Sequence, residues 1–188
     1  MQEVRTCCIM GDHLLRLPFE LNEGKLYGIK LKNTLRAQIV RLIEENAVTH
    51  FITSMALGIE QYAAEIVLDL KNIYPSITLE CVIPFETQAA LWTKAQRDKY
   101  YYIIENCDKE TLLQYHYTHD CMKQCNEYLV KQSQFIMAVW NGRYGQIERT
   151  IVYARSLLKK IYIIDPVTLK ISTDIQTFKK FLSISAEF

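Results

Sequence analysis

The feature of this sequence that most limits its fold is the alternation of short apolar runs with longer segments of helical periodicity. The short runs are rich in β-branched and aromatic residues, as buried strands are, and cover residues 5–10, 49–53, 77–83, 134–140 and 160–165. Strands that are apolar on both faces and separated by helices favour a parallel sheet covered on both sides. We therefore predict an α/β fold, a three-layer sandwich around a mainly parallel sheet.

The segments between these runs repeat apolar residues every three or four positions, which is the period of a helix with one buried face. Helices are predicted around the stripes at 31–43 and 59–70, and then over residues 86–106, 121–132 and 146–159. Two weaker signals remain. Residues 111–115 predict one more short strand, and residues 165–188 predict a loop followed by a short terminal helix.

No repeat, low-complexity tract or linker divides the chain, so we expect one domain over residues 1–188. The 22 basic residues nearly balance the 21 acidic ones, and a formal net charge of +1 gives no global field for nucleic acid or an anionic membrane. No apolar stretch of about 18 residues occurs, and the start lacks the pattern of a secretion signal. A cytoplasmic protein with six reduced cysteines is therefore expected.

In an open parallel sheet, ligands bind beyond the carboxyl ends of the strands, so the loops that follow strands are the places to search. Gly11 and His13 follow the first strand, residues 54–58 follow the second, and residues 140–145 follow the fifth. The turn at 54–58 runs straight into a helix, whose free backbone N–H groups and dipole favour a phosphate or carboxylate. The alternative is that Ser54 caps the helix while Ala56 and Gly58 allow close packing.

The loop at 140–145 has the same two interpretations. Asn141, Gly142 and Gly145 precede a helix and suit an anion or ribose contact, and an ordinary Asn-Gly turn is the alternative.

Two carboxylates are weak catalytic candidates. Glu60 could accept from a ribose hydroxyl, act on a water or only complement the helix dipole, and Glu65 needs a partner if it is buried.

The run from His116 to Cys125 contains histidines and cysteines that could hold a metal. It is a single cluster without a second cysteine pair, and structural zinc sites normally show tighter paired spacings. We expect neither a metal nor a resident cofactor.

Four segments together resemble the YpsA-like family of the SLOG superfamily, a bacterial family of unknown function. Residues 8–13 (CIMGDH) resemble its Thr-Gly-His-Arg opening, and residues 51–65 (FITSMALGIEQYAAE) resemble its Ser-Gly-x-Ala-x-Gly-x-Asp/Glu-x-x-Ala-Ala-Glu signature. Residues 117–133 and 138–154 resemble its Tyr-Thr-x-x-Cys-Met segment and its glycine-rich loop with the following helix. The resemblance implies a Rossmann-like sandwich with a pocket for a nucleotide-type ligand.

The residues that we expect to contact such a ligand come from the loops above and from one helix. They are Gly11, His13, Ser54, Met55, Ala56, Gly58, Glu60, Asn126, Asn141, Gly142 and Gly145. The chain departs from the family pattern at Ser54 (usually Gly), Cys125 (Arg), Lys131 (Asp) and Gln146-Ile147 (Gly-Thr). The resemblance therefore implies a divergent member, in which we expect an inherited phosphate site to be weakened.

Three functions follow from the resemblance. The leading one is the binding or sensing of a nucleotide, ADP-ribose or NAD-like molecule, with residues 54–58 at its anionic end. The second is hydrolysis of a nucleotide N-glycosidic bond, as in LOG-type enzymes, with Glu60 or Glu65 acting at the sugar. The third is a degenerate member that acts through protein interaction, and a homo-oligomer is one form that this could take. A nucleic-acid partner would need a basic groove with stacking aromatics, which the sequence does not supply.

Overall fold

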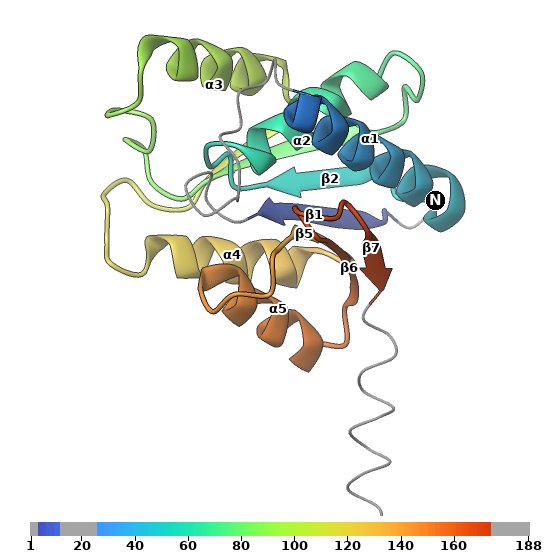
Figure 1. Ribbon diagram of the computed structural model, residues 1–188. Coiled ribbons are helices and arrows are strands. Elements are labelled where there is room, and N and C mark those ends of the chain that lie inside the picture. The colour runs from blue at the N-terminus through green and yellow to red at the C-terminus, as the bar shows by residue number, and fades with distance from the viewer. Residues whose placement is uncertain (1–3, 12–25, 174–188) are drawn as a thin grey trace, which may run out of the picture.

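The structure is a computed structural model that describes residues 4–11 and 26–173. One seven-stranded sheet lies between two layers of helices, with α1, α2 and α3 on one face and α4 and α5 on the other (Figure 1). The strands are β1 (Thr6–Gly11), β2 (His50–Thr53), β3 (Thr78–Ile83), β4 (Lys109–Leu112), β5 (Phe135–Val139), β6 (Lys160–Ile164) and β7 (Ile171–Thr173). The helices are α1 (Leu26–Asn46), α2 (Ile59–Leu70), α3 (Lys94–Asn106), α4 (Cys121–Gln132) and α5 (Gln146–Ser156).

The order of the strands across the sheet is β4-β3-β2-β1-β5-β6-β7. All neighbours are parallel except β6 and β7, which pair antiparallel. The predicted Rossmann-like sandwich with a mainly parallel sheet is thus confirmed. In the described part of the chain, none of the helices combines the length and the apolar character that a bilayer span requires.

The alternation of side chains along β1 explains why the central strands of the sheet are continuous apolar runs in the sequence. Cys7 and Ile9 belong to the core under α1, α2 and α3, whereas Cys8 and Met10 belong to the core under α4 and α5. Because successive strand residues point to opposite faces, a strand covered on both sides must be apolar at every position. The same division holds for β2 and β5.

Helix α3 begins later than the sequence pattern indicated. It starts at Lys94, and residues 84–93 form turns in place of the predicted helix from residue 86. Thr93 is the N-cap: its side chain accepts from the Gln96 N–H, and the Gln96 side chain accepts from the Thr93 N–H. This reciprocal capping box satisfies two backbone donors and fixes the start of the helix.

The C-terminal part of the described chain contains a strand that the sequence did not predict. β7 pairs with β6 at the edge of the sheet, where only loop was expected after Asp165. It has three residues, too few for a recognisable period. β4 confirms the short strand near residue 113, two residues earlier than predicted, and the predicted terminal helix lies outside the described residues.

Leu158 occupies a position that favours glycine. α5 ends in a Schellman motif, in which the Lys159 N–H donates to the Ala154 carbonyl at 3.0 Å and the Leu158 N–H donates to that of Arg155 at 2.9 Å. Leu158 has φ 54° and is 83% exposed, so it bears left-handed strain without burying its side chain. We expect Leu158→Gly to raise the free energy of unfolding by about 1 kcal/mol, and Tm by about 2–4 °C.

Urea denaturation checks this expectation, with Leu157→Gly as the matched control. Leu157 is the neighbouring residue and has φ −96°, which any residue adopts, so glycine there should lower stability. Equal effects of the two substitutions would contradict the assignment of strain to Leu158.

Candidate functional site

The strand order places a topological switch point between β1 and β5. From β1 the chain moves in one direction to β2, β3 and β4, and it then returns to the other side of β1 with β5. Gly11 and Val139 are paired at the carboxyl ends of these two strands. In open α/β sheets this is the crevice where ligands bind. It therefore defines the candidate site at the sheet edge to which the arrowheads of β1 and β2 point (Figure 1).

Gly11 ends β1 against the first residue of α2. A Cβ at this position would lie 2.5 Å from both Cβ and Cγ1 of Ile59 and 2.7 Å from its Cγ2. Carbon atoms do not approach so closely, so only glycine lets α2 pack at this distance from the strand. Gly11 thus has a packing role beside its predicted ligand contact. His13, predicted with it, lies outside the described residues.

The turn at residues 54–58 connects β2 to α2 through two left-handed residues. Met55 has φ 60°, and Gly58 has φ 106° with ψ −112°, a conformation essentially restricted to glycine. Side-chain amides hold the turn: Gln88 Nε2 donates to the Ser54 carbonyl at 3.1 Å and Gln61 Nε2 to that of Met55 at 3.3 Å. Ala56 is half-buried, whereas Ser54, Met55 and Gly58 are buried.

The first turn of α2 has no side-chain cap. Gly58 is the N-cap residue, so Ser54 does not cap the helix as the packing alternative supposed. Helices leave their first N–H groups without intrahelical partners, and the first residue of α2, Ile59, lies against Gly11 at the carboxyl end of β1. Two buried acceptors border the turn without a hydrogen-bond partner among the described residues, Thr53 Oγ1 and Gln88 Oε1.

Glu60 and Glu65 lie on different parts of the α2 surface, as their spacing predicted. Glu60 is 5% exposed, and its Oε1 accepts from the Gly11 N–H at 3.1 Å. Burial, followed by the nearby charge of Glu60, raises the pKa of the Cys125 thiol to about 12. Glu65 faces α1 and α3 and forms ion pairs with Lys99 at 3.2 Å and Lys32 at 3.8 Å. Only Glu60 is therefore at the candidate site.

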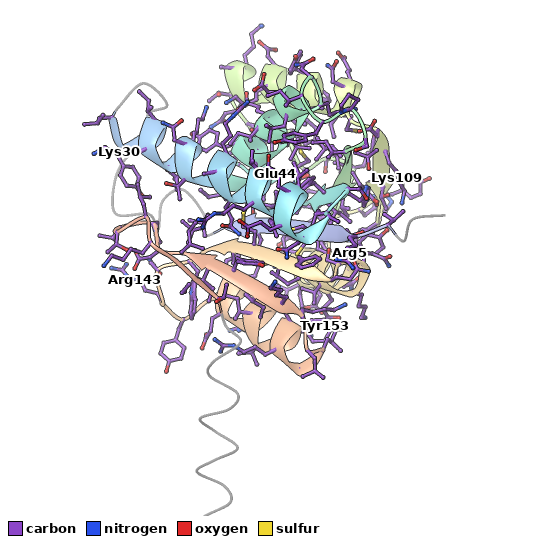
Figure 2. All side chains as sticks on the ribbon, turned by 90° about the vertical axis from the view of Figure 1, so that its right-hand side faces the viewer. Arg5, Lys30, Glu44, Lys109, Arg143 and Tyr153 are labelled. Atoms are coloured by element: carbon purple, nitrogen blue, oxygen red, sulfur yellow. The ribbon has the colours of Figure 1, made fainter. Side chains whose placement is uncertain are left out.

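The loop before α5 has the local bonds of an Asn-Gly turn. Asn141 Oδ1 accepts from the Arg143 N–H at 3.0 Å, and Trp140 Nε1 donates to the Arg143 carbonyl at 2.9 Å. Gly142 has φ 81°, with open space around an added Cβ, so the backbone conformation favours glycine there. The Gly145 N–H donates to Glu148 Oε2 at 3.4 Å. The exposed Arg143 lies on the outside of the molecule (Figure 2), and ligand contact by this loop stays a prediction.

Asn126 lies in a cleft between α4 and α5, on the other face of the sheet from α2. Its Nδ2 donates to Thr150 Oγ1 at 3.1 Å, and that hydroxyl donates to the Gln146 carbonyl at 2.9 Å. The cleft has a volume of about 510 Å³. Its lining comprises His119, Asp120, Met122, Lys123, Asn126, Glu127, Gln146, Arg149, Thr150 and Tyr153.

Sequence reasoning found Asn126 and missed the other residues of the cleft. The available signal was the spacing of Gln146, Arg149, Thr150 and Tyr153, which places four polar-tipped side chains on one face of a helix. That pattern is equally typical of a solvated surface. The cysteines of the nearby histidine- and cysteine-containing run, Cys121 and Cys125, are buried, and the described residues contain no group of three potential metal ligands.

Comparison with known proteins agrees with this topology. A model of the family described as YspA SLOG matches residues 9–165. A UPF0398 protein of Halalkalibacterium halodurans is 35% identical over 113 residues, which are 59% of each chain, and one of Shouchella clausii is 33% identical over 132 residues, 69% of this chain and 68% of the relative. An SPbeta prophage-derived protein of Bacillus subtilis is 31% identical over 72% of this chain and 84% of its own. The match to the Halalkalibacterium protein thus spans about three fifths of that relative.

Among solved structures, DNA processing protein A (DprA) from Streptococcus pneumoniae has a similar fold. The TM-score is 0.55 at 11% sequence identity, and the superposition covers 98% of this chain and 57% of DprA. At this identity the similarity concerns the fold alone.

Proposed function

Since the chain belongs to the YspA SLOG family, we propose that it binds or senses a nucleotide-derived molecule, such as a nucleotide, ADP-ribose or an NAD-like compound, at the switch point between β1 and β5. The anionic part of the ligand is held by the N-terminus of α2, and its polar remainder extends toward the loop before α5. The observation that carries the proposal is the uncapped start of α2 behind Gly58.

The chemistry of this turn suits a phosphate or carboxylate. Backbone N–H groups at a helix N-terminus carry a partial positive charge, and at the start of α2 no side-chain cap accepts from them, although Glu60 places a carboxylate in the first turn. Gly58 lacks a side chain that would keep a ligand away from the backbone. The unpartnered Thr53 hydroxyl can donate to an anion at the same edge, and Gln88 Oε1 can accept only from a donor in the polar part of the ligand.

The positions of the two carboxylates favour binding without turnover. Glu60 holds the end of β1 through the Gly11 N–H, and Glu65 is ion-paired on the outer surface of α2. A general base or acid has to reach the bond that it acts on, within about 3 Å or through one water. Because neither side chain is free for this task, we propose a binding or sensing role in preference to hydrolysis.

The cleft between α4 and α5 offers a place for the rest of an extended ligand. Each helix is the next element after a parallel strand, α4 after β4 and α5 after β5, so their first residues, among them Gln146, lie toward the carboxyl ends of the strands, as the turn at 54–58 does. Arg149 brings positive charge to the lining and Asn126 brings an amide, whereas Lys123 is paired with Glu127 at 4.0 Å and Asp120 adds a further carboxylate. A ligand with separated charged and polar parts matches this arrangement.

A pair of variants that differ only in charge tests the proposal. Ala56→Asp places a carboxylate two residues before the N-cap of α2, whereas Ala56→Asn adds a side chain of the same size without charge. We expect Ala56→Asp to weaken binding at least tenfold, a difference of about 1.4 kcal/mol, and Ala56→Asn to change it little. Binding is measured by thermal shift and calorimetry against nucleoside mono- and diphosphates, cyclic nucleotides, ADP-ribose and NAD.

The stability of the variants without ligand serves as the control. A carboxylate near a helix N-terminus is favourable, so Ala56→Asp should unfold no earlier than wild type. Equal affinity of the two variants for a ligand that binds wild type would exclude the α2 N-terminus as the anion site. No stabilisation of wild type by any of these compounds would refute the proposed function.

A further inference from the structure

A second cavity lies at the opposite edge of the sheet, between the C-terminal half of α1 and the strands β6 and β7. Its volume is about 390 Å³, within the range of small-molecule sites. The lining comprises Gln38, Arg41, Glu45 and Asn46 from α1, Lys160 and Tyr162 from β6, and Ile171 and Thr173 from β7. Figure 2 looks onto this edge, with Glu44 on α1 and with Arg5, which donates to the Asn46 carbonyl at 3.0 Å, close to the end of that helix.

Gln38 is the residue that a structural role does not explain. It projects from the inner face of α1, which is otherwise formed by Leu31, Leu35, Ile39 and Leu42, and it is only 2% exposed. Within residues 4–11 and 26–173 the side chain of Gln38 makes no hydrogen bond, and it lines the cavity. Its amide atoms are not sealed from solvent, unlike the fully buried and unpartnered Thr53 Oγ1 and Gln88 Oε1. An amide that lines a cavity without a partner is available to a ligand.

The other polar groups of the cavity are ordered around this amide. Tyr162 donates from its hydroxyl to Asn46 Oδ1 at 2.8 Å, which leaves the Asn46 amide nitrogen as a donor. Lys160 Nζ lies 5.4 Å from the ring centroid of Tyr162 and 5.7 Å from that of Phe135. No carboxylate of the described chain lies within ion-pair distance of Lys160, whereas Arg41 has Glu45 at 3.9 Å. The cavity therefore combines an unpaired amide with an unpaired cation.

We propose that this cavity binds a small organic anion that carries an amide-like edge, meaning a donor and an acceptor side by side. The amide of Gln38 pairs with that edge through its oxygen and nitrogen, as glutamine does with a nucleobase. Lys160, the cation of the lining without a carboxylate partner, holds the phosphate or carboxylate of the same molecule. Nucleoside monophosphates and N-acylated carboxamide amino acids share this chemistry.

The cavity is independent of the site at the β1–β5 switch point. Lys160 marks the amino end of β6, one of the parallel strands, whereas the turn at 54–58 lies beyond the carboxyl end of β2, at the opposite edge of the sheet. A variant of Ala56 therefore leaves binding at Gln38 unchanged, and a variant of Gln38 leaves binding at the switch point unchanged. The two proposals can fail separately.

The test follows the side-chain amide resonances of Gln38 by NMR while the full chain is titrated with four probes. AMP and UMP carry a nucleobase edge with a phosphate, N-acetylasparagine carries a carboxamide with a carboxylate, and inorganic phosphate carries no amide-like edge. We expect at least one of the first three probes to shift the Gln38 resonances at millimolar concentration. Lys160→Met should lower the affinity for that probe at least tenfold. The probe that binds identifies which source of this chemistry the cavity accepts.

Gln38→Met, which keeps the size of the side chain, completes the test, with Gln124→Met on the exposed side of α4 as control. Gln38→Met should keep a Tm close to that of wild type without ligand and should abolish the response to the probe. Gln124→Met should leave both the Tm and the response unchanged. Unchanged Gln38 resonances with all four probes, a response to inorganic phosphate alone, or equal affinity of wild type and Gln38→Met would each overturn the proposal.

Discussion

Gly11→Ala is expected to lower the free energy of unfolding by about 3 kcal/mol, since overpacking of a rigid contact costs roughly this much. The added methyl group would lie 2.5 Å from Cβ and Cγ1 of Ile59. Isoleucine is branched at Cβ and cannot rotate away, and its Cβ is fixed to the helix backbone. Either α2 moves away from β1 or the strand end shifts, and both changes disturb the hydrogen bond from Gly11 to Glu60. Urea denaturation at neutral pH measures the effect.

Two comparisons show whether the contact with Ile59 is the cause. Gly142→Ala adds a methyl group into open space at φ 81°, so it should cost only about 1 kcal/mol of left-handed strain. In an Ile59→Gly background, Gly11→Ala should cost much less than it does in wild type, because the clashing atoms are absent. An undiminished cost in that background would show that another contact of Gly11 is responsible.

Glu80→Ala should lower the free energy of unfolding at pH 7 by about 3 kcal/mol, the usual order for removing one partner of a buried charge network. Glu80 is 4% exposed on β3, in the core layer under α4. Its Oε1 accepts from Thr111 at 2.7 Å and Tyr128 at 3.4 Å, and its Oε2 accepts from Lys109 and His50, both at 3.1 Å. Removal of the carboxylate leaves these donors without their acceptor.

The contribution of Glu80 should also depend on pH in a defined direction. Burial alone would raise the pKa of Glu80, but the hydrogen bonds from Thr111, Lys109 and His50 together hold that pKa below its ordinary value. A carboxyl with a lowered pKa in the folded state stabilises the protein fully above the pKa of the unfolded chain, about 4.3. That stability is lost as the pH falls through the lowered pKa of the folded state. The difference between wild type and Glu80→Gln should therefore shrink as the pH falls from about 5 to about 3.

The comparison between variants removes the other acid-sensitive groups from this test. Partial burial raises the pKa of Asp108, but hydrogen bonds from Lys71 and from the Leu79 N–H outweigh it, so this pKa is also lowered. Asp108 titrates alike in wild type and Glu80→Gln, and its effect cancels. Glu105→Gln, on the exposed surface of α3, should change stability little at any pH. A difference for Glu80→Gln that stays constant down to pH 3 would contradict the lowered pKa.

The layers of the fold were predictable because they depend on local patterns. A strand such as 135–139 has to be apolar at every position when helices cover both faces, and the period of α2 follows from its one buried side. The start of α3 was predictable in principle from the spacing of Thr93 and Gln96, the signature of a capping box. β7 was not predictable, because its three residues are too few to show a strand pattern and it forms by pairing with β6.

The candidate site was predictable as a set of loops but not as a set of contacts. Sequence spacing placed Gly11 and Gly58 in loops that follow strands, yet the contact of Gly11 with Ile59 depends on how closely α2 approaches β1. Glu60 looked like a residue for a ligand or a water, and the structure shows its oxygen on the Gly11 N–H. Gln38 gave no signal, since a glutamine in a helical stripe is ordinary until its neighbours prove to be apolar.

The central claim is that an anionic ligand binds the start of α2 at the β1–β5 switch point, and the backbone amide resonances of the wild-type protein test it most directly. Titration with ADP-ribose and with the nucleotide that stabilises the chain most should shift the amides of Gly58, Ile59 and Glu60 first and furthest. Saturable shifts at these three amides would support the claim. Two results would contradict it. In the first, a ligand binds and shifts resonances elsewhere while the amides at the start of α2 stay unchanged. In the second, no ligand shifts any resonance.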